Sequence, residues 1–288
     1  MAEPAIRDIS DTAFWVAHFR ALENERPDPL FRDPLSGRLA GERGRQIAAA
    51  MPAARMTEWT LAMRTCIIDD FIRSAIGGGV DAVLNLGSGL DTRPYRMDLP
   101  ASLRWIDADY PRIVEYMERS LAAERPRCRL ERARIDLTDV TARRKLFAEA
   151  NAGSKRLLIL TEGVVPYLSP DEAGSLADDL RNLDRAHYWV VDYFSPQAMK
   201  YQQRKGMDRA MQNARFRFAP EDWFGFFRDH GWRSREIRYL ADLGEQLRRP
   251  IPLPRLFKLA MALISPLVPK ERRGAFLKFA GFVLLEPV

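Results

Sequence analysis

The sequence has few residues of the kinds that bind metals or form cross-links. It contains two cysteines, Cys66 and Cys128, and three histidines among 288 residues. Neither cysteine lies in a CxxC pair and no histidines stand at ligand spacing, so a zinc site is not expected. Two isolated cysteines indicate free thiols in a cytoplasmic protein, although one disulfide between them stays open.

Targeting and membrane signals are also missing. The first residues have no basic start followed by an apolar stretch, so no signal peptide is expected. No apolar run reaches the length of about 18 residues that a membrane span needs. The cytoplasm is therefore the expected location. The composition, 47% hydrophobic and 29% charged, is typical of a globular protein with a well-buried core.

Positive charge is concentrated toward the end of the chain. The net charge is +6, and residues 200–288 hold 18 of the 45 Lys and Arg residues but 9 of the 39 Asp and Glu residues. A basic region of this kind can attract nucleic acid, an acidic partner or an anionic substrate. A solvated basic surface is the alternative interpretation.

Seven largely apolar segments predict strands, with helical patterns between most of them. The segments are residues 81–87, 103–109, 129–137, 156–163, 187–194, 235–240 and 281–287. Continuous apolar runs that alternate with helices predict a mostly parallel, Rossmann-like α/β sheet covered by helices on both faces.

We expect this sheet to belong to a single domain over residues 1–288. Residues 1–80 read as a helical N-terminal lid region, and residues 81–194 as a cofactor-binding core. Long insertions at about 195–234 and 241–280 are expected to form a lid over the substrate, because such loops usually serve function. Within them, residues 253–273 are expected to fold over the pocket as a helix, with a membrane-surface helix as the alternative.

A glycine-rich bend follows the first predicted strand. In "AVLNLGSGLDTRPYR", residues 82–96, the apolar run stops at Gly87-Ser88-Gly89. Glycine tolerates positive φ and lets a ligand approach the backbone. Two phosphate-binding patterns do not fit, because Thr92 stands where a dinucleotide fingerprint has its third glycine and no Gly-Lys-Ser/Thr follows.

Acidic residues end the next four predicted strands. They are Asp107 with Asp109, then Asp136, Glu162 and Asp192. The carboxyl ends of parallel strands form the ligand-binding edge of such a sheet, and an acidic edge suits phosphate poorly. Asp109 follows Gly87 at roughly the 20-residue spacing at which a carboxylate binds ribose hydroxyls. S-adenosylmethionine (AdoMet), which has a ribose and no pyrophosphate, fits these features best.

These residues resemble a known family. "VLNLGSGLDTRPYR", "WIDADYP" and "LILTEGVVPYL" are similar to motifs of the leucine carboxyl methyltransferase family of class I AdoMet-dependent methyltransferases, and the likeness extends to "RPDPLFRDP" and "RTCIID" upstream. The resemblance implies a seven-stranded sheet with an antiparallel last strand. It also implies an AdoMet-dependent O-methyltransferase that acts on a carboxylate or phenolic hydroxyl of a small molecule, as in natural-product pathways.

The resemblance assigns one group of residues to the methionyl part of AdoMet. It implies that Arg64 pairs with the carboxylate, where a guanidinium grips in a bidentate manner, and that Glu162 faces the ammonium. Gly87 and Gly89 would let the methionyl portion lie against the backbone. An exposed helix arginine is the alternative for Arg64, and a simple turn is the alternative for the two glycines.

The resemblance assigns a second group to the nucleoside. Asp109 would bind the ribose hydroxyls, with Asp107 as the less favoured candidate for the same role. Asp136 and the backbone amide of Leu137 would read the adenine edge. Asp109 could instead cap the helix that begins at Pro111, and Asp136 could cap the next helix.

One departure from the family concerns the acceptor. Members that methylate the C-terminal leucine of a protein carry an N-terminal lysine in the cofactor site, whereas the first lysine here is Lys145. A small-molecule acceptor is therefore expected, either anionic or presented by an acidic carrier protein. No general base can be assigned from the sequence, and the oligomeric state stays open.

Two other functions are alternatives to a small-molecule methyltransferase. The first is a nucleic-acid-binding or RNA-modifying protein of the same fold that uses the basic C-terminal third. Enzymes that methylate bases often carry Asp/Asn-Pro-Pro-aromatic after strand four, but residues 162–165 read Glu-Gly-Val-Val, so nucleic acid is not expected. The second is a scaffold without catalysis, which the intact motif residues disfavour.

Overall fold

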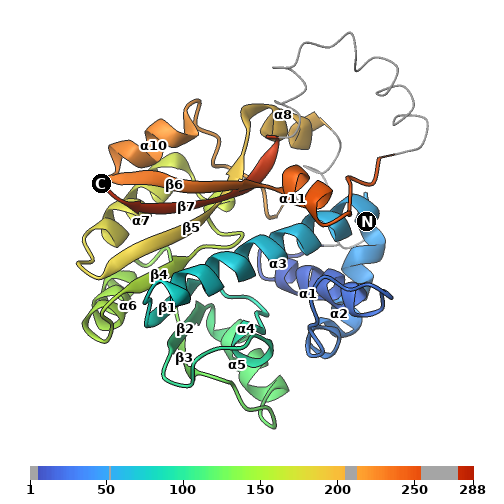
Figure 1. Ribbon diagram of the computed structural model, residues 1–288, viewed down its shortest axis with the longest axis horizontal. Helices are drawn as coiled ribbons and strands as arrows, with labels where there is room; N and C mark the ends of the chain where they lie inside the picture. The colour runs from blue at the N-terminus through green and yellow to red at the C-terminus, as the bar shows by residue number, and fades with distance from the viewer. Residues whose placement is uncertain (1–5, 52, 205–212, 254–277) are drawn as a thin grey trace.

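The computed structural model describes residues 6–51, 53–204, 213–253 and 278–288. Figure 1 labels the helices and strands. In chain order they are α1 (Asp11–Asn24), α2 (Ser36–Ala50), α3 (Ala54–Gly77), β1 (Ala82–Leu86), α4 (Arg93–Arg96), β2 (Arg104–Asp109), α5 (Pro111–Ser120), β3 (Arg129–Arg134), α6 (Val140–Ala152), β4 (Leu157–Leu160), η1 (Val165–Tyr167), α7 (Pro170–Arg181), β5 (Ala186–Phe194), α8 (Pro196–Arg204), α10 (Trp223–Asp229), β6 (Trp232–Tyr239), α11 (Leu240–Gln246) and β7 (Ala280–Pro287).

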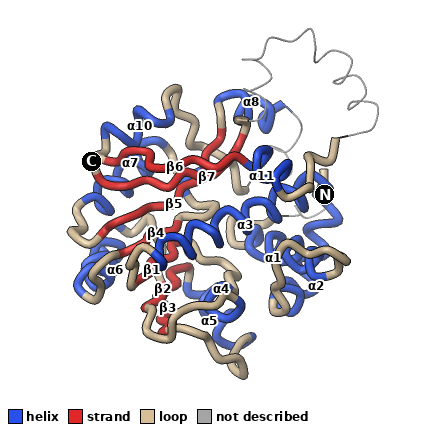
Figure 2. Tube along the Cα trace, viewed as in Figure 1, coloured by secondary structure: helices blue, strands red, loops and turns tan. Residues whose placement is uncertain are grey.

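All seven predicted strands join one sheet in the order β3-β2-β1-β4-β5-β7-β6 (Figure 2). Strands β1 to β5 pair in parallel, and β7 runs antiparallel to both β5 and β6. The expected fold class, including the antiparallel last strand, is therefore confirmed. The chain order reverses between β1 and β4, which is where open parallel sheets bind ligands.

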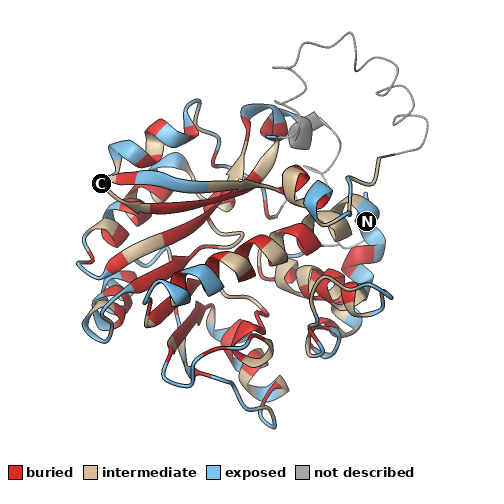
Figure 3. Ribbon diagram, in the orientation of Figure 1, coloured by how far each residue is buried: buried red, intermediate tan, exposed pale blue. Residues whose placement is uncertain are grey.

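Helices cover both faces of the sheet, which explains why β1 and β4 are buried along their whole length (Figure 3). Ile68 and Phe71 of α3 lie in the core on one face. Phe147 of α6 and Leu180 of α7 lie in the core on the other face. Strands buried on both faces need continuous apolar sequence, and this is the pattern that predicted them.

The N-terminal helices pack beside the ligand-binding edge of the sheet. Ala17 of α1 and Leu39 of α2 share a buried cluster with Leu90, which follows the glycine bend, and with Ile113 of α5. This contact brings α1 over the carboxyl ends of β1 and β2 (Figure 1).

Neither of the two helix caps considered from the sequence is present. Ser169 and Glu172 form a capping box at the start of α7. Helix α6 is capped by Asp139, whose carboxylate accepts from Ala142 N at 3.0 Å, so the alternative of Asp136 as its cap is wrong. Helix α5 follows Tyr110 without a side-chain cap, so Asp109 does not cap it either.

The predicted insertions are described only in part. Helices α8 and α10 lie in the first insertion and α11 begins the second. The helix expected over 253–273 lies, apart from its first residue, outside the described residues. Among the helices that the structure describes, none has both the length and the apolar character needed to cross a membrane. Cys66 and Cys128 are both free thiols.

Candidate functional site

A cleft made of two adjoining pockets lies at the ligand-binding edge of the sheet. One pocket has about 560 Å³ of space and the other about 680 Å³, including space that is open to solvent. Both pockets are lined by Thr12, Ala13, Gly87, Gly89, Gly163 and Tyr167. The two pockets are therefore halves of one cleft, with α1 on one side and the loops after β1 and β4 on the other.

The glycine bend forms the floor where the halves meet. Gly87 and Gly89 have φ values of 63° and 54°, in the left-handed region that favours glycine. The amides of Gly87 and Ser88 donate to Ala108 O at 2.8 and 3.2 Å, which fixes the bend against β2. A Cβ on Gly87 would overlap the Val164 side chain. The bend needs glycine for its conformation and for the close approach of the loop after β4.

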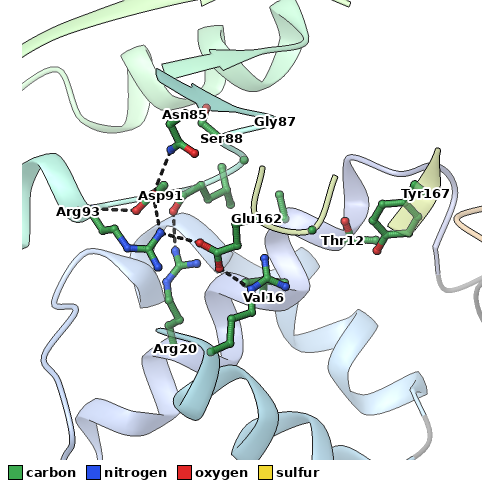
Figure 4. Close-up of a pocket in the computed structure, with 15 residues that line it drawn as sticks. Thr12, Val16, Arg20, Asn85, Gly87, Ser88, Asp91, Arg93, Glu162 and Tyr167 are labelled. Carbon is green, nitrogen blue, oxygen red and sulfur yellow. Dashed lines mark hydrogen bonds and ion pairs between the residues drawn. The ribbon is translucent and has the colours of Figure 1, made fainter. Parts of the chain in front are cut away.

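Glu162 lies between two arginines in the first half of the cleft. Its Oε1 accepts from Arg64 Nε at 2.5 Å, and its Oε2 accepts from Arg93 Nη1 at 2.6 Å. Figure 4 shows the Arg93 side chain directed toward Glu162 and Asp91. Burial alone would raise the pKa of Glu162, but the two guanidinium charges hold it well below its usual range. Glu162 is therefore ionised at every physiological pH.

The sequence did not assign a role to Arg93, although the residue is part of the quoted "LDTRPYR" motif. Its side chain is buried and also bonds Asp69 at 2.7 Å and Asp91 at 2.8 Å. A nearly buried Arg96 pairs with the same Asp69. A buried charge needs partners of opposite sign. This group of ion pairs therefore fixes the position of the Glu162 side chain in the cleft.

Arg64 is positioned to bind an anion in the cleft. Its side chain is 17% exposed, so the alternative of an exposed helix arginine is wrong. Nε donates to Glu162, and Nη2 lies 3.0 Å from the place of a Cβ on Gly163. Nη1 and Nη2 donate no hydrogen bond to any residue that the structure describes. These two atoms are the fork that binds carboxylates in a bidentate manner.

The second half of the cleft is largely apolar with a carboxylate at one side. Ile113, Ile135 and Leu137 line it together with Asp109. Asp109 accepts from Gly89 N at 2.6 Å and from Tyr110 N at 2.7 Å, one on each oxygen. Burial raises the pKa of Asp109 above its ordinary value, against these two hydrogen bonds. Each oxygen keeps a lone pair that can accept from a ligand hydroxyl.

Asp136 also lines this second half, but it is an exposed residue. Its Oδ1 accepts from both the amide and the hydroxyl of Thr138, at 2.9 and 2.7 Å. These bonds turn the chain so that Leu137 faces the pocket. The structure thus brings Gly87, Gly89, Asp109, Asp136 and Leu137 to one pocket.

Asp107 does not reach the cleft. Its Oδ1 accepts from Trp105 Nε1 at 2.8 Å and from Asn85 Nδ2 at 3.0 Å. The same Asn85 amide also donates to Asp91 Oδ2 at 3.1 Å. Asn85 therefore bridges two buried carboxylates, and Asp107 braces the base of the bend. Of the two candidates for the ribose hydroxyls, the structure places only Asp109 in the cleft.

This position gives Asp107 an influence on stability that depends on pH. Burial, with the nearby charge of Asp91, raises its pKa to about 7 from 3.8. The cost of ionisation in the folded state is absent below about pH 4 and complete above about pH 7, so it lowers stability as pH rises through this window. We expect Asp107→Asn to stabilise the protein at pH 8, by on the order of 4 kcal/mol, and to change little at pH 4.

Urea unfolding at the two pH values measures this difference. The exposed Asp98 gives a matched control, and Asp98→Asn should show no such pH-dependent gain. An equal effect of Asp107→Asn at both pH values would contradict the assignment.

The N-terminal segment supplies a wall that the sequence did not predict in detail. Ile9, Ser10 and Thr12 line the second half of the cleft. Arg112 of α5 holds this segment by bonds to both Asp8 oxygens, at 2.8 and 2.6 Å, and to Ser10 Oγ at 2.7 Å. These residues belong to no recognisable motif. They line the cleft only because of where α1 packs, and this position cannot be read from the local sequence.

Comparison with known proteins decides the family. The leucine carboxyl methyltransferase family matches residues 13–181. The chain belongs to this family. The match covers the residues that line both halves of the cleft from Ala13 to Leu168.

Curated relatives extend the match over most of the chain. A Parafrankia protein, provisionally named as an S-adenosyl-L-methionine-dependent methyltransferase, is 32% identical over 267 residues, covering 85% of this chain and 83% of its own. A Frankia alni protein with the same provisional name is 29% identical, covering 84% of this chain and 88% of its own. Both names agree with the cofactor that the sequence predicts.

Two solved structures share the fold of this chain. A Thermobifida fusca protein provisionally named a methyltransferase matches with a TM-score of 0.59 at 18% identity, covering 99% of this chain and 95% of its own. A DUF574 protein from Streptomyces avermitilis matches with a TM-score of 0.54 at 14% identity, covering 94% and 96%. The sheet described above is thus a methyltransferase fold.

Proposed function

We propose that this family member is an AdoMet-dependent O-methyltransferase that acts on a carboxylate or phenolic hydroxyl of a small molecule. The observation that carries the proposal is the division of the cleft. One half is polar and holds Arg64 and Glu162, and the other is apolar and holds Asp109. AdoMet has the same division between a zwitterionic methionyl arm and an adenosine.

The residues present fit this cofactor. Arg64 would hold the carboxylate, Asp109 the ribose hydroxyls, and Asp136 with the Leu137 amide the adenine edge. Gly87 and Gly89 leave the floor free of side chains at the junction of the halves. Glu162 would face the ammonium while keeping Arg64 oriented. When bound, AdoMet supplies an electrophilic methyl group.

The chain's own contribution is alignment and the exclusion of water. The N-terminal wall and the loop after β4 both line the junction. Holding two reactants in line can supply up to about 7–11 kcal/mol of the barrier. A carboxylate acceptor is already ionised at pH 7, whereas a phenol with a pKa near ~10 would need a base or a positive environment. Two features disfavour a nucleic-acid base as the acceptor. Residues 162–165 read Glu-Gly-Val-Val, and both carboxylate oxygens of Glu162 are hydrogen-bonded to arginines.

Binding of S-adenosylhomocysteine (AdoHcy), the spent cofactor, tests the site without an acceptor. We expect calorimetry to show binding to the wild type and a loss of about 10- to 100-fold for Asp109→Ala, the usual effect of removing a charged hydrogen-bond partner. Glu115→Ala, an exposed acid on the neighbouring α5, is the control and should bind normally. Wild-type protein that shows no heat with millimolar AdoHcy would refute the proposal.

The chemistry of the acceptor is tested separately. We would offer tritiated AdoMet with 2-naphthoate and with 2-naphthol, which share one ring system and differ in the oxygen group. Methyl esters release methanol in mild base, whereas aryl methyl ethers do not. Volatile label after base treatment would identify a carboxylate acceptor, and stable label a phenol. Label on neither compound, or label on nitrogen or carbon of other acceptors, would count against O-methylation of this class.

A further inference from the structure

Tyr167 stands at the junction of the two halves of the cleft. Six residues line both halves, and Tyr167 is the only one of them with a large side chain; the others are glycine, alanine or threonine. Figure 4 shows the Thr12 and Tyr167 side chains next to each other. Burial raises the pKa of Tyr167 to about 12. The phenol is therefore neutral at pH 7 and can orient a group but not take a proton from it.

Two more aromatic rings adjoin Tyr167 in series. The Phe216 ring meets the Tyr167 ring edge-on, with centroids 5.1 Å apart and planes at 74°. The Phe194 ring, at the end of β5, lies 5.5 Å from Phe216. All three residues are half-buried. We call Tyr167, Phe216 and Phe194 the aromatic ledge.

Backbone hydrogen bonds hold the ledge in place. Arg217 N and Phe218 N both donate to Pro166 O, at 2.8 and 3.2 Å. These bonds tie the segment that carries Phe216 to η1, which carries Tyr167. The ledge is therefore built from η1, β5 and residues 213–218, which lie far apart in the sequence.

The ledge differs from the aromatic group in the core of the sheet. There Trp189 packs against Phe227 at 5.3 Å and against Trp232 at 5.2 Å, and all three side chains are fully buried. Tyr167 and Phe216 also pack against a smaller buried cluster that includes Ile6 and Trp15. Unlike the rings of the core group, the ledge rings keep part of their surface exposed, and Tyr167 lines the cleft.

We propose that the aromatic ledge is the acceptor subsite and that it selects acceptors with a flat aromatic body. This inference rests on the proposed function. A methyl donor with one arm in each half of the cleft has its sulfonium at their junction, beside Tyr167. An acceptor that meets the methyl group there contacts Tyr167, and the Phe216 and Phe194 rings that adjoin Tyr167 extend this aromatic surface. Aromatic rings prefer offset or edge-on contact with other rings, so a planar aromatic acceptor gains more from this surface than a saturated one of equal size.

Equilibrium binding to the AdoHcy-loaded protein tests the proposal. The probes are 2-naphthoate and decahydro-2-naphthoate, which share the carboxylate and the carbon skeleton and differ in aromaticity. We expect the wild type to bind 2-naphthoate about 10-fold tighter, and Phe216→Leu to reduce this preference to about 2-fold. Phe216→Tyr keeps the ring and should restore the preference. Ring-current shifts of the naphthoate protons should diminish in Phe216→Leu only.

Control variants separate the ledge from general effects of aromatic loss. Phe224→Leu removes an exposed ring of α10 that lies outside the cleft and should leave the preference unchanged. AdoHcy affinity should be the same in every variant. If AdoHcy binds but the wild type binds both probes equally, binds neither at millimolar concentration, or keeps its preference in Phe216→Leu, the ledge is not the subsite and the proposed function stands. Absence of AdoHcy binding would refute the proposed function and this inference together.

Discussion

Replacing Glu162 by glutamine is expected to weaken AdoHcy binding by at least ~100-fold and to lower the melting temperature by about 5 °C or more. The carboxylate neutralises Arg64 and Arg93, and both arginines are largely buried. Removing one member of a buried ion pair costs about 3–5 kcal/mol, because the remaining charge is left without a partner. Arg64 would also lose the bond that orients it toward the cleft.

Calorimetry with AdoHcy and thermal unfolding measure the two effects. Glu172→Gln is the matched control, because Glu172 pairs with Arg217 at 3.1 Å while its side chain is 42% exposed. An exposed pair contributes at most about 1 kcal/mol, so this control should bind AdoHcy normally. If Glu162→Gln behaves like Glu172→Gln, the ion pairs are not what shapes the methionyl half of the cleft.

Gly87→Ala is expected to abolish AdoHcy binding and to destabilise the fold. A left-handed conformation costs a residue with a Cβ about 1–2 kcal/mol, and the overlap with Val164 adds about 1–3 kcal/mol of overpacking. The new methyl group would also raise the floor at the junction of the two halves. Calorimetry and urea unfolding check the two effects separately.

The matched control for this change is Gly77→Ala at the end of α3. A Cβ there meets no atom within 4 Å, and Gly77 is not among the residues with positive φ. Helix propensity then favours alanine, so the control should be neutral or slightly stabilising. Normal AdoHcy affinity in Gly87→Ala would mean that the bend does not carry the ligand.

The sequence predicted the sheet well because its strands are buried on both faces. Continuous apolar runs such as "AVLNL" and "LLIL" mark β1 and β4 without ambiguity. The residues at the strand ends could be placed together because parallel strands end at the same edge. This rule is why Gly87, Asp109, Asp136 and Glu162 were found, although it could not separate Asp109 from Asp107. Asp107 and Asp109 are two positions apart in β2, so their side chains lie on the same face of the sheet and strand periodicity does not distinguish them. Only the turn after β2 determines which of the two carboxylates reaches the cleft.

The rest of the site depends on contacts that no local pattern encodes. Arg93 bonds Asp69 and Glu162, which lie 24 and 69 positions away along the chain. The wall formed by Ser10 and Thr12 exists because α1 packs on Leu90 and Ile113. Side chains brought together by tertiary packing carry no periodicity or fixed spacing, so a single sequence does not reveal them.

The N-terminal wall has a consequence for how the protein acquires its binding capacity during synthesis. Helix α1 leaves the ribosome first, yet the surface on which it packs includes Leu90 and Ile113, and the opposite wall of the cleft ends at Leu168. A nascent chain that stops before Tyr167 therefore has its first helix complete but no enclosed site. The cleft can hold a nucleoside only after the residues through Leu168 have been synthesised and α1 has packed on segments made much later.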